Sequence, residues 1–223
     1  MKKQKKRKLW IALGLLAAFV LWTAAIRLID VRTIGPQGSA VGFAQLNRYV
    51  HALTGVHMSL YAVTDWLGLV PVGTAFGFAL VGLIQWVKRK RIGAVDQSIL
   101  VLGGFYLAVM AVYVLFELCA VNYRPVLIDG NPEVSYPSST TMLVLTVMPT
   151  AAMQWNTRIG KPVLRRGVIF ATAAFAVFMV VGRLFSGVHW ITDIIGGVLL
   201  SAGLVMLYVS LVDNGAAESI YSD

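Results

Sequence analysis

The sequence predicts an all-α integral membrane protein with six transmembrane helices, and three observations support this fold class. Hydrophobic residues make up 58% of the 223 residues, and charged residues make up only 13%. Soluble domains contain about 45–50% apolar and about 25% charged residues. The mean hydropathy is +0.75. Finally, apolar runs near the ~20 residues that a membrane-spanning helix needs alternate with short polar segments.

Six apolar runs are the expected spans. They cover residues 9–29, 67–87, 95–120, 141–155, 163–181 and 191–212. The fourth run is short, and its Pro149 predicts a kink. The first run is longer than the ~7–15 apolar residues of a usual signal peptide, which favours a retained anchor over a cleaved leader. Residues 38–61 place apolar side chains at helical spacing among polar ones, and this predicts an amphipathic helix on the membrane surface between the first two spans.

The basic residues indicate a topology. The net charge is +9, and most Lys and Arg residues lie in three clusters beside apolar runs, at 1–8, 88–91 and 158–166. Such spacing is typical of the positive-inside rule and argues against nucleic-acid binding. It predicts a multi-pass plasma-membrane protein with both termini in the cytoplasm. The predicted organisation is a basic tail (1–8), one membrane domain (9–212) and a cytoplasmic C-terminal tail (213–223).

The predicted topology gathers unusual polar residues on the outer face. All three histidines, His51, His57 and His189, fall in the outer segments. Cys119 is the single cysteine, so no disulfide can form within the chain. A channel or ordinary transporter is disfavoured because the predicted spans carry almost no charge to line a path.

The stretch "GRLFSGVHWITD", residues 182–193, carries the first part of a candidate site. His189 and Asp193 are four residues apart at the start of the last span, so a helix places them on one face. A carboxylate there can fix the histidine tautomer and leave the other ring nitrogen free as a nucleophile or base. Arg183 ends the previous span, and its guanidinium suits bidentate recognition of a phosphate.

The second outer loop supplies the other part. Arg124 is a second cation, and "PSSTT" at 137–141 places hydroxyl and backbone N–H groups where the fourth span begins. The N-terminus of a helix favours anions. Two arginines, this cradle and an oriented histidine predict a phosphoryl-transfer site, because such catalysis consists mostly of positioning and charge stabilisation.

At these residues the chain resembles the type 2 phosphatidic acid phosphatase superfamily of membrane lipid phosphatases. The family pattern is K-x6-RP, then PSGH, then SR-x5-H-x3-D. Here the three blocks read "ELCAVNYRP" (117–125), "PSST" (137–140) and "GRLFSGVHWITD" (182–193). The resemblance implies a phosphohistidine intermediate on His189, with Asp193 as its orienting residue. It also implies a phosphate cradle formed by Arg124, Ser138, Ser139, Thr140 and Arg183, with no metal and no cofactor.

The chain departs from the family at three positions. Gly182 replaces a serine. Glu117 replaces the lysine, so we expect this carboxylate to be neutral, turned away, or paired with an arginine such as Arg124. Thr140 replaces the histidine that protonates the leaving oxygen, and loss of a general acid typically costs ~10²–10⁴-fold in rate.

The missing acid favours a substrate with a good leaving group. An alkoxide is very basic, near the conjugate base of water with its pKa of ~15.7, whereas a leaving phosphate monoester has a second pKa of ~6. A lipid diphosphate, such as an isoprenoid diphosphate, therefore needs the acid less than a monophosphate does. His51 or His57 is the alternative proton donor, and either would restore monophosphates as substrates.

The predicted function is thus a membrane phosphohydrolase that acts on a lipid phosphate, preferentially a lipid diphosphate, at the outer face. Two alternatives stay open. One is a catalytically degenerate relative that binds or moves lipid phosphates, and the other is a phosphotransferase to an acceptor other than water. Retention of both His189 and Asp193 favours chemistry, because binding alone would need only the cations.

Overall fold

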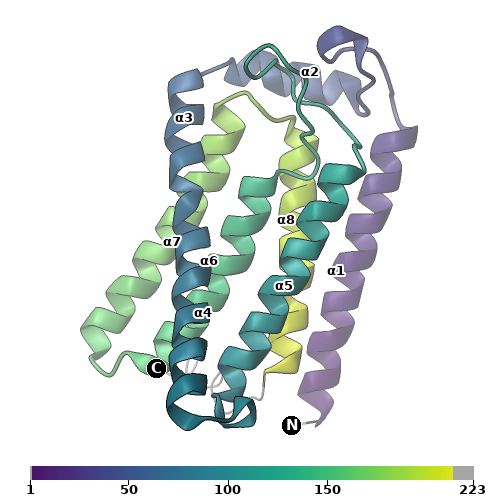
Figure 1. The fold of residues 1–223 in the computed structure, drawn as a ribbon. Helices are drawn as coiled ribbons and strands as arrows, with labels where there is room; N and C mark the ends of the chain where they lie inside the picture. The colour runs from purple at the N-terminus through teal and green to yellow at the C-terminus, as the bar shows by residue number, and fades with distance from the viewer. Residues whose placement is uncertain (1, 213–223) are drawn as a thin grey trace.

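The computed structural model describes residues 2–212, and the predicted tail at 213–223 lies outside this range. Its helices are α1 (Lys2–Leu28), η1 (Pro36–Gly38), α2 (Ala44–Thr54), α3 (Met58–Leu67), α4 (Leu69–Arg89), η2 (Ile92–Ala94), α5 (Gln97–Leu118), α6 (Ser139–Arg158), α7 (Pro162–Phe185) and α8 (Ile191–Leu211). The long helices run roughly parallel to one bundle axis (Figure 1). Since α1 begins at Lys2, it includes most of the predicted basic tail.

Five helical segments among the described residues are long and apolar enough to cross a membrane. They are Lys3–Leu28, Met58–Arg89, Gln97–Leu118, Pro162–Phe185 and Ile191–Leu211. The prediction of an all-α membrane protein is therefore confirmed, but six spans are not shown. The expected fourth span is the helix α6, which continues through Pro149 but falls short of the other five in hydropathy.

The polar composition of α6 follows from its place in the bundle. The helix contacts α4, α5, α7 and α8, so it has neighbours on several sides. Its buried residues include Thr146, Thr150 and Gln154. Thr146 and Thr150 donate their hydroxyls to backbone carbonyls one turn earlier, at 2.7 and 2.8 Å. A helix that packs against protein can keep such side chains, because they find partners and do not face lipid.

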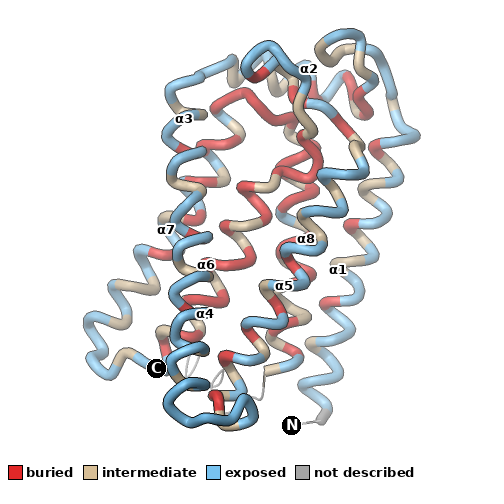
Figure 2. The backbone as a smooth tube through the Cα atoms, in the orientation of Figure 1, coloured by how far each residue is buried: buried red, intermediate tan, exposed pale blue. Residues whose placement is uncertain are grey.

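The exterior of the bundle is apolar. Large hydrophobic side chains such as Phe76, Leu107 and Phe170 are more than 70% exposed. Buried residues concentrate instead on α6 and α8 and near the loops at one end (Figure 2). An apolar exterior around a partly polar interior is the arrangement that hydrocarbon surroundings favour.

The two ends of the bundle carry different residues. The basic end holds the clusters at 3–8, 88–91 and 158–166, and the opposite end, here the histidine end, holds His51, His57 and His189 (Figure 1). This separation agrees with the predicted topology.

The helix α2 lies across the histidine end of the bundle (Figure 1). An amphipathic helix was expected over residues 38–61, but α2 covers only Ala44–Thr54. The chain turns at Gly55, whose φ of 67° suits a residue without a Cβ, and then enters α3. The second part of the predicted helix thus belongs to the segment that runs down the bundle as α3 and α4.

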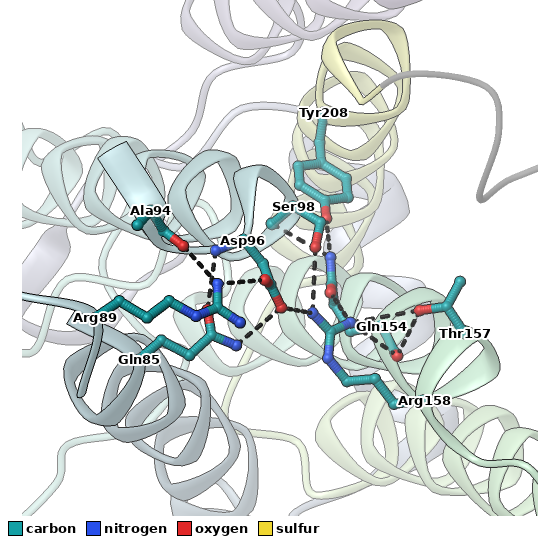
Figure 3. Close-up of polar contacts among 9 residues, drawn as sticks. All are labelled: Gln85, Arg89, Ala94, Asp96, Ser98, Gln154, Thr157, Arg158 and Tyr208. Carbon is teal, nitrogen blue, oxygen red and sulfur yellow. Dashed lines mark hydrogen bonds and ion pairs between the residues drawn. The ribbon is translucent and has the colours of Figure 1, made fainter. Parts of the chain in front are cut away.

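A polar cluster around Asp96 joins four helices at the basic end (Figure 3). Asp96 accepts hydrogen bonds from Arg89 at 2.9 Å and from Gln85 at 2.8 Å. Arg158 lies 4.0 Å from the same carboxylate, and Gln154 donates to the hydroxyl of Tyr208 at 2.8 Å. The Arg89 and Gln85 hydrogen bonds hold the pKa of Asp96 below its usual value, so the carboxylate stays charged and binds its neighbours.

Candidate active site

The turn between α7 and α8 presents His189 just before α8 begins. Asp193 lies one turn later, and its Oδ2 is 3.7 Å from Nδ1 of His189. Asn122 donates to Oδ1 of Asp193, and the backbone N–H of Trp190 donates to Oδ2, both at 3.0 Å. The carboxylate is therefore held in place and faces the imidazole, as the four-residue spacing predicts.

Both ring nitrogens of His189 are buried without a hydrogen-bond partner. Burial lowers the pKa of His189 well below its usual value, and the positive charges of Arg183 and Arg124 lower it further. The ring is consequently neutral at pH 7, and a neutral imidazole has a lone pair available for attack. Unsatisfied buried polar atoms are uncommon in folded proteins and often mark a functional position.

The segment between α1 and α3 holds this turn in position. The backbone N–H of His57 donates to the carbonyl of Ser186 at 2.9 Å. Asn47 is buried and donates to the hydroxyl of Thr192 at 3.0 Å. At Gly187, where φ is 71°, an added Cβ would lie 1.9 Å from the carbonyl oxygen of Gly55. The sequence had indicated no role for this N-terminal region.

Arg183 and Arg124 approach the site from α7 and from the loop after α5. Their guanidinium carbons lie 5.0 and 5.6 Å from the ring centroid of Tyr61, so one aromatic face contacts both cations. Arg183 is 1% exposed, and its Nε has no partner; Arg124 is 8% exposed, and its Nη1 has none. Buried donors without acceptors are what an anion-binding site offers before it is filled.

A cavity of 520 Å³ lies in front of these arginines. Its lining residues are Tyr61, Asp65, Tyr113, Glu117, Arg124, Glu133, Val134, Ser139, Thr140 and Arg183. Ser139 and Thr140 of the predicted cradle thus line the same cavity as the two arginines. Ser138 does not line the cavity; it is fully buried as the N-cap of α6, and its hydroxyl accepts from the N–H of Thr141.

Two carboxylates that the sequence did not single out pair with the arginines. Nε of Arg124 lies 2.9 Å from Glu133, and Nη1 of Arg183 lies 3.5 Å from Asp65. The expected pairing of Arg124 with Glu117 is therefore not found. Glu117 is not turned away either, because it lines the cavity. Glu133 reaches Arg124 because the loop folds back, with Tyr123 bridged to Val134.

The other two histidines lie outside the cavity lining. Nε2 of His51 is 3.1 Å from the carbonyl oxygen of Gly187, and Nε2 of His57 is 2.9 Å from that of Thr54. Both rings are thus engaged with backbone groups of the surrounding loops. Neither is placed to protonate a group leaving from the cavity.

The substitution at Gly182 has a steric reason. A Cβ at this position would lie 2.8 Å from the methyl group of Thr64. That threonine also accepts a weak hydrogen bond from Arg183 at 3.4 Å. In α8, a Cβ at Gly196 would lie 2.4 Å from the ring of Tyr136, so the absence of a side chain at this position permits close packing.

Fold and site together define a multi-pass membrane protein in which a cavity lined by two buried arginines lies near a buried histidine–aspartate pair. Residues 120–216 match the family model of the PAP2 superfamily. The matched part contains Arg124 and the second and third sequence blocks. The predicted family resemblance is confirmed.

A solved structure shares the fold. It is the transmembrane PAP2-type phosphatidylglycerolphosphate phosphatase from Bacillus subtilis, which is similar to this chain with a TM-score of 0.50 and 21% sequence identity. The match covers 95% of this chain and 98% of the other. None of the curated proteins matches the sequence.

Proposed function

We propose that this protein is a membrane phosphohydrolase that removes phosphate from a lipid phosphate, preferentially a lipid diphosphate, through a phosphohistidine on His189. The observation that carries the proposal is that two kinds of buried polar group at the site lack hydrogen-bond partners. His189 is neutral with two free ring nitrogens, and Arg124 and Arg183 have buried N–H groups without acceptors. A phosphoryl group would supply acceptors to the arginines and an electrophile to the histidine.

The reaction would proceed in two displacements. Nε2 of His189 attacks phosphorus with its lone pair, and the bond from phosphorus to the leaving oxygen breaks with its electrons on that oxygen. Asp193 keeps the proton on Nδ1 and stabilises the positive charge that develops on the ring. A water molecule then attacks the phosphohistidine, the N–P bond breaks with its electrons on Nε2, and phosphate leaves.

Access to His189 requires a small rearrangement. The ring is 3% exposed and does not line the cavity, whereas the two arginines that shift its pKa do. Binding of phosphate to Arg124 and Arg183 would draw their guanidinium groups toward the cavity. The same movement would open the way to Nε2 and tighten the 3.7 Å contact with Asp193.

The residues that line the cavity support a diphosphate substrate. Thr140 lines it at the position of the missing acid, and neither His51 nor His57 does. The titratable groups that line it besides the arginines are carboxyls and phenols. A carboxylate that is charged at neutral pH carries no proton to give, so a leaving group of low basicity is favoured.

The proposal includes the membrane arrangement. With α6 as a sixth crossing, every predicted basic cluster lies at one end, and the positive-inside rule places that end in the cytoplasm. The cavity at the histidine end then faces the outer side. Attachment of a membrane-impermeant thiol reagent to Cys119, which is exposed at the histidine end, would test this orientation in intact cells.

The first experiment is phosphate release by the purified protein in detergent without added metal. A polyprenyl diphosphate and a phosphatidic acid are compared in the wild type, in His189→Ala and in His57→Ala. We expect release from the diphosphate to exceed that from the monophosphate, and to fall at least ~10³-fold in His189→Ala. The His57→Ala control should stay active, because this exposed ring lies outside the cavity lining.

A role in binding or moving lipid phosphates is the second candidate, and the burial of His189 favours it. Binding requires only the arginines and the cavity, and both are present without any rearrangement. If neither lipid releases phosphate in a His189-dependent way while both stabilise the protein against heat, the hydrolase proposal is wrong and the binding role holds.

A further inference from the structure

The charge lining the cavity is unusual for a site that takes only a phosphate. Three carboxyl groups, those of Asp65, Glu117 and Glu133, face two guanidinium groups, those of Arg124 and Arg183. A phosphate adds negative charge to a lining that already has one carboxylate in excess. Phosphate alone is therefore a poor electrostatic complement to this cavity.

Glu117 is the carboxylate in excess. Asp65 pairs with Arg183 and Glu133 pairs with Arg124, but within residues 2–212 no basic side chain forms an ion pair with Glu117. It lies on the last turn of α5, one turn after Tyr113, and both side chains line the cavity. The site thus presents an unpaired anion beside two cations with unsatisfied donors.

These two features point to a ligand with two charges. The free Nη1 of Arg124 and the free Nε of Arg183 belong to residues that are only 8% and 1% exposed, and these donors favour an anion as ligand. The Glu117 carboxylate calls for a cation close to that anion. The described His, Cys, Asp and Glu side chains form no group of three or more that could hold a metal ion. A cation carried by the ligand itself would meet this need.

We infer that the cavity selects a zwitterionic headgroup, a lipid phosphate or diphosphate with a protonated amine near the phosphate. The phosphate lies on Arg124 and Arg183, and the ammonium group lies on Glu117. The cavity of 520 Å³ falls within the ~300–1,000 Å³ of small-molecule pockets and leaves room for more than a phosphate group. This inference rests on the proposed function and specifies its substrate class.

The test compares two substrates that differ in one charge. One is a long-chain 2-aminoalkyl diphosphate, and the other is its N-acetyl derivative, which keeps the chain and the diphosphate but loses the ammonium charge. We expect the wild type to prefer the amine by about fivefold in kcat/KM, as for a partly exposed ion pair of about 1 kcal/mol. In Glu117→Gln this ratio should fall to about one.

The matched control is Asp129→Asn, which removes an exposed carboxylate from the same loop region but outside the cavity lining. It should keep the wild-type ratio. The inference is overturned if the wild type treats the two diphosphates alike, or if Glu117→Gln keeps the preference for the amine.

A binding measurement separates this inference from the proposed function. The shift in melting temperature with each diphosphate is recorded for the wild type, Glu117→Gln and His189→Ala. If no variant hydrolyses either compound but the amine still stabilises the wild type more than it stabilises Glu117→Gln, the hydrolase proposal fails and the zwitterion inference stands. Equal stabilisation by both compounds in the wild type would overturn the inference.

Discussion

At the basic end of the bundle Asp96 binds Arg89 and Gln85, whereas at the histidine end His189 leaves both ring nitrogens without partners. Both ends hold polar side chains in a largely apolar molecule. At the basic end these side chains have hydrogen-bond partners, whereas at the histidine end several polar atoms have none. Each buried polar group without a partner costs about 1–3 kcal/mol. A site that keeps several such groups is poorly explained by stability and well explained by a ligand that completes it.

The same contrast holds for the arginines. Arg158 donates to Gln154 and to the hydroxyl of Ser98, and its position ties α6 to α5. Arg183 is more deeply buried, yet its Nε donates to nothing. The basic end therefore holds helices together, whereas the histidine end keeps buried donors without partners, which the proposed ligand would occupy.

The largest expected effect comes from one isosteric change made at both ends. Asp193→Asn should lower phosphate release by about 10²–10⁴-fold, because an amide does not hold the imidazole tautomer or stabilise the developing positive charge. Asp96→Asn should leave release close to the wild-type rate. The two variants are compared by kcat/KM, with the fold checked by circular dichroism.

Similar losses in Asp193→Asn and Asp96→Asn would contradict the division of roles between the two ends. A full loss in Asp193→Asn together with a collapsed fold would instead indicate a structural role for this carboxylate. Asn122 and the backbone N–H of Trp190 each donate a hydrogen bond to one carboxylate oxygen of Asp193. An asparagine keeps only one of these two acceptors, so some loss of stability accompanies the change.

A smaller effect is expected from Gln154→Leu at the basic end. The change leaves the Tyr208 hydroxyl, on a side chain that is 1% exposed, without the donor that now lies 2.8 Å away. We expect stability to fall by about 2 kcal/mol, with kcat/KM changed less than about twofold. Thermal unfolding in detergent measures the loss, and the exposed Gln97→Leu is the control.

The smallest expected effect is a difference in the pH range over which His189 at one end and Asp96 at the other contribute to stability. Because the pKa of His189 is lowered on folding, only the unfolded chain takes up its proton as the pH falls below about 6.5. The contribution of His189 to stability should therefore decrease by about 1 kcal/mol between pH 6.5 and 5.5. The Asp96 contribution is present above its ordinary pKa of 3.8 and is lost only as the pH falls through its lower folded value.

Melting curves at pH 7.0 and 5.5 for the wild type and His189→Asn test this prediction. The variant should lose the part of the pH dependence that His189 causes. An unchanged pH dependence in His189→Asn would show that the ring is not held neutral by its surroundings.

Local patterns predicted much of the molecule. Apolar runs located five spans, since hydropathy and length are properties of each segment alone. The spacing of His189 and Asp193 predicted that the two side chains lie close together, although His189 lies in the turn before α8 and not on the helix itself. Charge clusters predicted which segments lie at the same end.

Long-range partners were beyond this kind of reasoning. Asp65 is 118 residues from Arg183, and no pattern along the chain connects them. Asn122 donates a hydrogen bond to Asp193, which lies 71 residues later in the chain. The sequence could have indicated this role only through the position of Asn122 two residues before Arg124. The choice of Glu133 over Glu117 as the partner of Arg124 depends on how the loop folds back.

The sequence by itself indicated the membrane class, the family resemblance and the histidine–aspartate pair, because each depends on composition or on short motifs along the chain. Only the tertiary structure decided that α6 can be polar, that Ser138 is a cap, and that Glu117 faces the cavity unpaired. Helix packing sets these outcomes, since it fixes which side chains meet across the bundle and which are left for a ligand.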